Sequence, residues 1–162
     1  MERAVTEPRL KSPPLVLDSS AIISLFFREK FENEIVRIIE GQSHFATMDL
    51  SYAELGSAAW KSVAIFKQAV EPIREALRQA TNFISDNCEV VSSKEIVGEA
   101  FEMGTKHGIQ IYDCLFLCLA KKLESQVLTT DERLHNKVNQ IKELRGMVFP
   151  MNFGRLANSN LR

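Results

Sequence analysis

The segment IYDCLFLCLA, residues 111–120, decides which class of fold the sequence encodes. Six consecutive apolar side chains, from Leu115 to Ala120, leave a helix with almost no polar face, so the segment predicts a buried helix over residues 111–124. Asp113 lies at the start of this helix. Burying a carboxylate in the protein interior costs free energy, unless an oppositely charged partner balances it or a functional site needs its charge. The segment therefore predicts a core helix and a specific role for Asp113.

Short apolar runs alternate with helical patterns along the chain. The strand-like runs are LVLD (15–18), HFAT (44–47), CEVV (88–91), QVLTT (126–130) and MVF (147–149). Apolar residues at helical spacing predict helices between them, including one over residues 69–85 and one from Ser92 or Ser93 to His107 that ends at Gly108. Strands that alternate with helices predict parallel βαβ crossovers, and hence one α/β sandwich with four or five short parallel strands.

The length of 162 residues suits one domain, which we place at residues 15–150. Residues 1–14 end in a double proline and predict a flexible leader, and residues 151–162 predict a loose polar tail. An odd number of cysteines, three, favours a reducing compartment. No apolar run approaches the length of a membrane span, and the leader has no signal-peptide core, so we expect a cytoplasmic protein without a membrane partner.

The net charge of −1 provides no basic field that would indicate a nucleic-acid partner. If four acids bind a metal ion, however, setting aside their four negative charges changes the balance from −1 to +3. The charge balance therefore leaves a nucleic-acid partner open.

Two of the predicted strands lead into an aspartate. LVL is followed by Asp18 and VLTT by Asp131, while Asp113 begins the helix that leads to the second of these strands. Ligands of open parallel sheets bind outside the carboxyl ends of the strands, where the strand order reverses. Each aspartate alone is more simply an N-cap or a turn residue. Together, two strand-end acids and one acid at the start of a buried helix predict a shared site.

Glu54 is the fourth candidate acid, within DLSYAELGSAAWK (49–61). Helical spacing groups it with Leu50, Ala53, Ser57 and Ala58. We expect this stripe to be the buried face of a helix, and a glutamate among small residues there indicates a ligand of the same site. A partly exposed glutamate at the margin of the stripe fits the pattern equally well.

Four converging carboxylates without a basic partner repel one another, and a hard divalent cation removes that repulsion. Mg²⁺ or Mn²⁺ prefers carboxylate and water oxygens, retains several waters and binds the phosphate oxygens of a substrate. Such an ion lowers the pKa of a bound water and neutralises charge on a phosphodiester during in-line displacement. The hydroxyls of Ser20 and of Thr129 or Thr130 are placed to orient a ligand or its water, although turn capping explains each of them as well.

The remaining patterns are less specific. Cys114 and Cys118 are four residues apart but have no third ligand at metal spacing, so we expect them to be buried packing residues. No histidine pairs with a recognisable nucleophile. Basic residues along the long helices fit either a track for a phosphate backbone or a solvated helix face: Lys61, Lys67, Arg74 and Arg78.

These motifs resemble the PIN-domain ribonucleases, and most closely the VapC-type toxins of toxin–antitoxin pairs. The resemblance rests on Asp18 with Ser20 two residues later, on AEL around Glu54, on YDCLFLCLA around Asp113 and on VLTTDERL around Asp131. It spans residues 15–150. Two features depart from the family pattern, namely the leader and the length of the segment from Lys61 to Asn87.

The resemblance implies a three-layer α/β/α sandwich with a mostly parallel sheet, and a Mg²⁺- or Mn²⁺-dependent RNA endonuclease. It assigns metal binding and catalysis to the four matching acids, Asp18, Glu54, Asp113 and Asp131. It also implies a homodimer and a small antitoxin protein whose tail lies across the active-site groove. On this basis we expect a metal-activated water to hydrolyse RNA phosphodiester bonds.

Three other functions compete with this expectation. A haloacid dehalogenase-like phosphatase needs an aspartate two residues after the first, where this chain has Ser20. A PIN-like module that binds RNA or a protein without cleaving it is a second alternative, and a PIN nuclease with a role in RNA processing is a third. All four acids are present, which favours cleavage. The sequence identifies neither the RNA nor the number of metal ions.

Overall fold

The structure is a computed structural model that describes residues 12–154; residues 1–11 of the predicted leader and 155–162 of the predicted tail lie outside them. The described elements are, in chain order, β1 (Leu15–Leu17), α1 (Ser19–Phe26), α2 (Glu32–Glu40), β2 (Phe45–Met48), α3 (Leu50–Ala64), α4 (Val70–Asn87), β3 (Cys88–Val91), α5 (Ser93–His107), α6 (Ile111–Lys122), β4 (Val127–Leu128) and α7 (Glu132–Gln140). The first four predicted strands therefore form. No helix in this part of the chain is long and apolar enough to cross a membrane.

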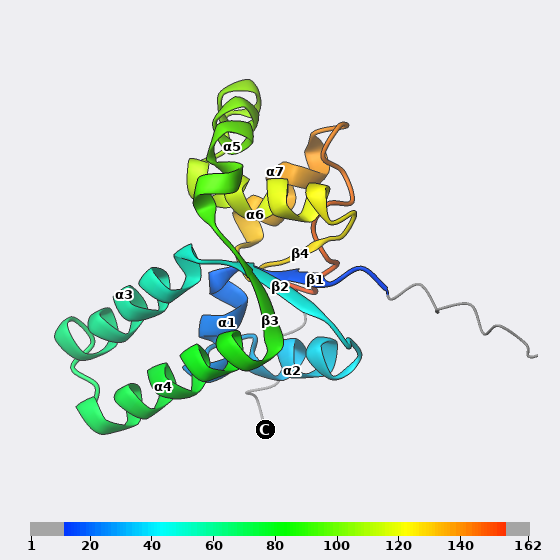
Figure 1. The fold of residues 1–162 in the computed structure, drawn as a ribbon. Coiled ribbons are helices and arrows are strands. Elements are labelled where there is room, and N and C mark those ends of the chain that lie inside the picture. Colours follow the sequence, from blue (N-terminus) through cyan, green and yellow to red (C-terminus); the bar gives the residue numbers. More distant parts are fainter. Residues whose placement is uncertain (1–11, 155–162) are drawn as a thin grey trace, which may run out of the picture.

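The strands form one parallel sheet in the order β3-β2-β1-β4 (Figure 1). From β1 through β3 the chain moves toward one edge, and it then returns across the sheet to place β4 on the other side of β1. Because parallel crossovers are right-handed, this return sends the intervening helices to the opposite face of the sheet. The strand order therefore reverses between β1 and β4.

Helices cover both faces of the sheet (Figure 1). Alternate residues of β1 point into different cores, because successive side chains of a strand point to opposite faces. Val16 packs with residues of α5, α6 and α7, whereas Leu15 and Leu17 pack with residues of α1, α2, α3 and α4. The predicted three-layer α/β/α sandwich with a four-stranded parallel sheet is confirmed.

The helix α6 is the buried helix that the sequence predicts. All residues from Cys114 to Ala120 are buried, and α6 packs along α5. Gly104 of α5 leaves room for the turn that leads into α6, because a Cβ atom there would lie 2.9 Å from the carbonyl oxygen of Ile109. Gly108 ends α5 in the left-handed conformation, with a φ of 62°. The cysteines of α6 are free packing residues.

The helices α3 and α4 form an antiparallel hairpin that extends beyond the sheet (Figure 1). This hairpin accounts for the length of the segment from Lys61 to Asn87. In the turn between the helices, Lys67 has a φ of 57°, and its ammonium donates a hydrogen bond to the carbonyl oxygen of Ala64 (2.7 Å). The contact satisfies a carbonyl at the end of α3, where backbone acceptors have no partner within the helix.

The predicted fifth strand at residues 147–149 is wrong. Only Val148 pairs with the sheet, through an isolated parallel bridge to Val127. The bridge consists of two hydrogen bonds of Val127, whose N–H donates to the carbonyl oxygen of Met147 (2.8 Å) and whose carbonyl oxygen accepts from the N–H of Phe149 (2.8 Å).

Residues 151–154, the described part of the predicted tail, contact the rest of the chain. The ring of Phe153 lies 5.4 Å from that of Phe31 and 5.1 Å from that of His135, measured between centroids. Met151 is buried as well. These apolar side chains pack with the hydrophobic core that includes residues of α1 and α2.

Candidate functional site

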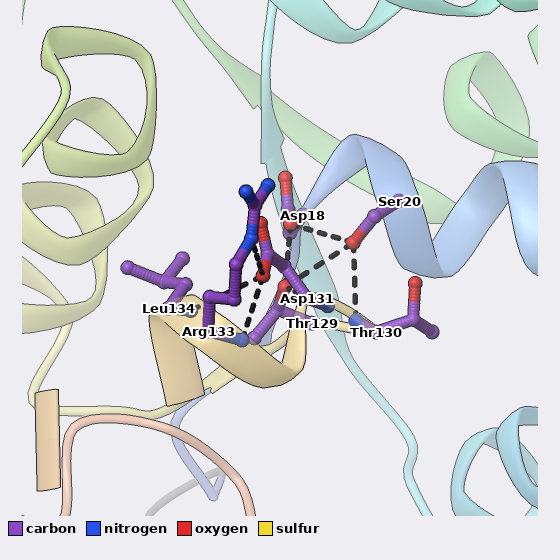
Figure 2. A network of polar contacts seen from close by, with 7 residues as sticks. All are labelled: Asp18, Ser20, Thr129, Thr130, Asp131, Arg133 and Leu134. Carbon is purple, nitrogen blue, oxygen red and sulfur yellow. Dashed lines mark hydrogen bonds and ion pairs between the residues drawn. The ribbon is translucent and has the colours of Figure 1, made fainter. Parts of the chain in front are cut away.

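Asp18 lies at the carboxyl end of β1, with only 9% of its surface exposed. Its Oδ2 atom accepts hydrogen bonds from the hydroxyls of Ser20 (2.6 Å), at the start of α1, and Thr129 (2.7 Å), which follows β4 (Figure 2). Burial raises the pKa of Asp18, and the hydrogen bonds from these hydroxyls oppose the increase. Ser20 and Thr129 thus hold a buried carboxyl group in one orientation.

Thr130 does not share this role. Its backbone N–H donates a hydrogen bond to Oγ of Ser20 (3.1 Å), and its side chain points away from Asp18 (Figure 2). Of the two threonines that the sequence offers, only Thr129 brings its hydroxyl to the carboxyl of Asp18.

Asp131 is the N-cap of α7. Its Oδ1 atom accepts hydrogen bonds from the backbone N–H groups of Arg133 (2.8 Å) and Leu134 (3.2 Å), and lies 3.8 Å from Nε of Arg133 (Figure 2). The simpler interpretation of this acid, as a helix cap, therefore holds for one of its oxygens. The cap fixes the side chain at the edge of the sheet where Asp18 lies.

Glu54 lies at the margin of the buried face of α3 rather than within it. The buried residues of α3 are Ser51, Leu55 and Ala59. Ala53 and Ser57, which the sequence places on the buried stripe, are exposed. The predicted stripe is thus displaced, and the alternative of a partly exposed Glu54 describes its position.

Satisfied polar groups explain the displacement of this stripe. The hydroxyl of Ser51 lies 3.0 Å from Oγ of Ser19 and 2.8 Å from Oγ1 of Thr47, and all three side chains are buried. A serine whose hydroxyl finds partners in the core is not detected by apolar periodicity. Partial burial raises the pKa of Glu54; a hydrogen bond with Ser19 opposes this increase, and the charge of Asp18 adds to it.

Asp113 occupies the first turn of α6 and is half-buried. Burial raises its pKa to about 6; the negative charges of Asp18, Asp131 and Glu54 add to the increase, and Arg133 opposes it. The carboxyl of Asp113 therefore lies within electrostatic reach of the other three acids.

The four acids line one cleft of about 440 Å³. It opens at the carboxyl ends of β1 and β4, where the strand order reverses and where open parallel sheets bind their ligands. Side chains of α1 and α3 form its walls. A larger groove of about 820 Å³ beside α5 and α6 contains none of the four acids, so volume alone does not identify the site.

Several residues that line this cleft were not singled out from the sequence, among them Ser19, Glu29 and Phe66. Burial of its carboxyl group raises the pKa of Glu29, although the residue as a whole is exposed. Phe66 lies in the turn after α3 with 68% of its surface exposed. Local sequence carries no signal for Phe66, because the direction of the α3–α4 hairpin brings it to the cleft.

The oxygens of the cleft suit Mg²⁺ or Mn²⁺, because carboxylates and hydroxyls are hard ligands. Burial is the main reason that the pKa values of Glu54 and Asp113 are raised, and the negative charges of neighbouring acids add to both increases. Within residues 12–154, no three His, Cys, Asp or Glu side chains surround a single point as a complete metal cage. Magnesium is often bound by one or two carboxylates together with waters and substrate phosphates, so the acids fit an open site of that kind.

Another strand-end acid, Asp49, has a different role. It follows β2, does not line the cleft, and accepts hydrogen bonds from the hydroxyl of Ser92 (3.1 Å) and from the hydroxyl (2.6 Å) and backbone N–H (2.9 Å) of Ser93. The side-chain hydrogen bond from Ser93 is the main reason that the pKa of Asp49 lies below its usual value. Asp49 therefore holds the start of α5.

Comparison with known proteins agrees with this fold and cleft. The PIN domain family matches residues 15–139, more than half of the chain, so this chain belongs to the PIN domain family. Ribonuclease VapC3 from Pyrobaculum aerophilum is 28% identical over 123 residues, which cover 76% of this chain and 93% of that protein. The predicted resemblance to PIN-domain proteins of the VapC type is confirmed.

A solved structure shares the same fold. The crystal structure of PAE2754 from Pyrobaculum aerophilum matches with a TM-score of 0.60 at 18% identity, and the match covers 76% of this chain and 78% of that one. At this identity the similarity concerns the fold alone.

Proposed function

We propose that this PIN domain is a Mg²⁺- or Mn²⁺-dependent RNA endonuclease and the toxin of a toxin–antitoxin pair. The observation that carries the proposal is the gathering of Asp18, Glu54, Asp113 and Asp131 along one cleft at the reversal of strand order. A relative that covers most of the domain is named a ribonuclease, which supports RNA as the substrate. A small antitoxin partner, a homodimer and a cytoplasmic location belong to the same proposal.

In this proposal, the residues of the cleft have the following roles. One or two of the four carboxylates hold the ion, together with waters and an RNA phosphate. When bound, the ion lowers the pKa of a water molecule and neutralises charge on the phosphodiester. Ser20 and Thr129 keep the carboxyl of Asp18 in one orientation. The buried helix α6 holds Asp113 rigidly at the mouth of the cleft.

A cleavage time course on labelled RNA tests this function. Mg²⁺ or Mn²⁺ is compared with EDTA, for the unchanged protein and for Asp113→Asn prepared in parallel. We expect products only from the unchanged protein with metal. Equal cleavage by both proteins would mean a contaminating nuclease or a wrong site. RNA retention without products, even in excess Mn²⁺, would favour the non-cleaving binding module instead.

A further inference from the structure

The far end of the cleft differs in chemistry from its acidic end. Phe27, the residue that follows α1, and Ala58 of α3 also line the cleft; Lys61 lies in the last turn of α3, and Phe66 lies in the turn after it. Glu54 and Lys61 are two helical turns apart, which is about 10 Å along the helix. A ligand phosphate at the acids therefore leaves room along this wall for a neighbouring part of the same ligand.

Lys61 is the cation of this wall. Four basic residues along the long helices are candidates from the sequence for contacts with a phosphate backbone. In the structure these four residues differ in their partners. Arg74 and Arg78 each form an ion pair with a glutamate three residues earlier on α4, and Lys67 donates to a backbone carbonyl. Within residues 12–154, no carboxylate forms an ion pair with Lys61. Of the four, Lys61 also is the one that lines the cleft.

Phe66 is the exposed aromatic residue of this wall. Its ring belongs to neither hydrophobic core of the described residues, and 68% of its surface is exposed. The backbone of Phe66 is held in the turn, because its N–H donates to the carbonyl oxygen of Lys61 (3.0 Å) and the ammonium of Lys67 donates to the carbonyl oxygen of Ala64. An exposed aromatic ring and an unpaired cation that line the same cleft are typical of surfaces that bind single-stranded nucleic acid.

We propose that Lys61 and Phe66 form a subsite for an unpaired nucleotide next to the cleaved phosphodiester, in which Lys61 binds a backbone phosphate and Phe66 stacks on a base. This subsite rests on the proposed function for its substrate, RNA. Every base offers a π-face to an aromatic ring, but only an unpaired base is free to leave its neighbours and stack there. The subsite therefore selects single-stranded regions and loops over duplex RNA. Glu29 also lines the cleft, and its negative charge would repel a phosphate, whereas the positive charge of Lys61 would attract one.

Binding measurements without metal test the subsite separately from cleavage. Fluorescence anisotropy in EDTA follows a labelled single-stranded RNA and the same sequence as a duplex, with Phe66→Ala, Phe66→Trp and Lys61→Gln. The matched controls are Phe101→Ala and Lys142→Gln, because both residues are exposed and lie outside the cleft.

We expect Phe66→Ala to weaken binding of the single strand about 5- to 150-fold, the range for loss of one stacked base, with little effect on the duplex. Phe66→Trp should restore the affinity. Lys61→Gln should reduce the slope of log affinity against log salt by about 0.7, the value for one lost phosphate contact on a single strand. Both controls should behave like the unchanged protein.

The outcomes separate the subsite from the nuclease, once cleavage with Mn²⁺ is measured on the same proteins. Cleavage by the unchanged protein, with no effect of Phe66→Ala or Lys61→Gln on binding, would overturn the subsite and leave the nuclease standing. Phe66-dependent binding without cleavage would support the subsite and contradict the nuclease. If the cleft instead receives a protein segment, RNA binding will not respond to Phe66→Ala, which overturns the subsite. If the unchanged protein neither binds RNA in EDTA nor cleaves it with Mn²⁺, both the subsite and the nuclease are overturned.

Discussion

Asp18 and Asp49 each follow a strand of the same parallel sheet, β1 and β2, yet their surroundings are opposite. Burial raises the pKa of Asp18, which lines the cleft, whereas hydrogen bonds from Ser93 and Ser92 lower the pKa of Asp49. The sheet explains the difference. Beside β1 the strand order reverses and a crevice opens, while beyond β2 the start of α5 occupies the corresponding position. A strand-end acid becomes part of a site only where the topology leaves a crevice.

The largest contrast between these two acids is expected in catalysis. Asp18→Asn should reduce metal-dependent RNA cleavage by at least about 100-fold, the scale on which one charged catalytic group contributes. Asp49→Asn should leave the cleavage rate unchanged, because Asp49 is outside the cleft. Single-turnover cleavage rates of both variants, with circular dichroism to verify folding, test the contrast. Equal losses in the two variants would remove the distinction between the two strand ends.

A smaller effect is expected from the hydroxyl that holds Asp18. Thr129→Val removes the hydrogen bond to Asp18 and the acceptor for the backbone N–H of Asp131. Loss of such an outer contact lowers metal affinity or activity by about 10- to 100-fold. Thr130→Val is the matched control, since the side chain of Thr130 points away from Asp18. Comparable activity of the two valine variants would show that the orientation of Asp18 is unimportant.

The dependence of folding stability on pH should differ between Asp113, which lines the cleft, and Asp49, which has a structural role. The pKa of Asp113 is about 6 in the folded chain and 3.8 is its ordinary value, so the folded state binds the proton more tightly. Stability therefore falls as pH rises from about 4 to about 6, and remains lower above that range. In EDTA at pH 7, Asp113→Asn should stabilise the protein by about 1 kcal/mol, less than full burial would give, because the carboxyl is partly exposed. Urea unfolding at pH 4 and pH 7 measures the difference; destabilisation at pH 7 would contradict it.

Asp49 should have the opposite and smaller pH dependence. Its pKa is lowered from 3.8 in the folded chain, so its charge stabilises the fold above pH 3.8 and that contribution is lost as the pH falls below it. Asp49→Asn should destabilise the protein at pH 7 by about 0.5 kcal/mol, because asparagine keeps an acceptor oxygen but loses the charge beside the start of α5. The same urea series measures this loss, and a stabilised Asp49→Asn variant would refute the structural role.

Local patterns were sufficient for most of the fold. Apolar runs bounded by polar residues predicted β1 to β4, and the unbroken apolar surface of residues 115–120 predicted a helix buried between α5 and the sheet. Contacts between segments that are far apart in the sequence could not be predicted. Ser51 is buried because Ser19 and Thr47 satisfy its hydroxyl.

The site was predictable only in part, for a related reason. Their position at the end of a predicted strand indicated Asp18 and Asp131, but the same rule selects Asp49 equally well. The rule cannot distinguish these acids, because local sequence does not determine the order of the strands in the sheet. Glu54 was selected from a stripe that is not the buried one, although it does line the cleft. The exposure of Phe66 depends on where the α3–α4 hairpin ends, which no periodicity encodes.

Mn²⁺ binding by titration, followed through the electron paramagnetic resonance signal of the free ion, tests most directly whether the acids at the β1–β4 reversal form a metal site. The titration compares the unchanged protein with Asp18→Asn, Asp113→Asn and Asp49→Asn. We predict binding by the unchanged protein and by Asp49→Asn, and affinity at least about tenfold weaker for Asp18→Asn and Asp113→Asn. The same affinity in all four proteins, or no binding by the unchanged protein, would contradict a metal site in this cleft.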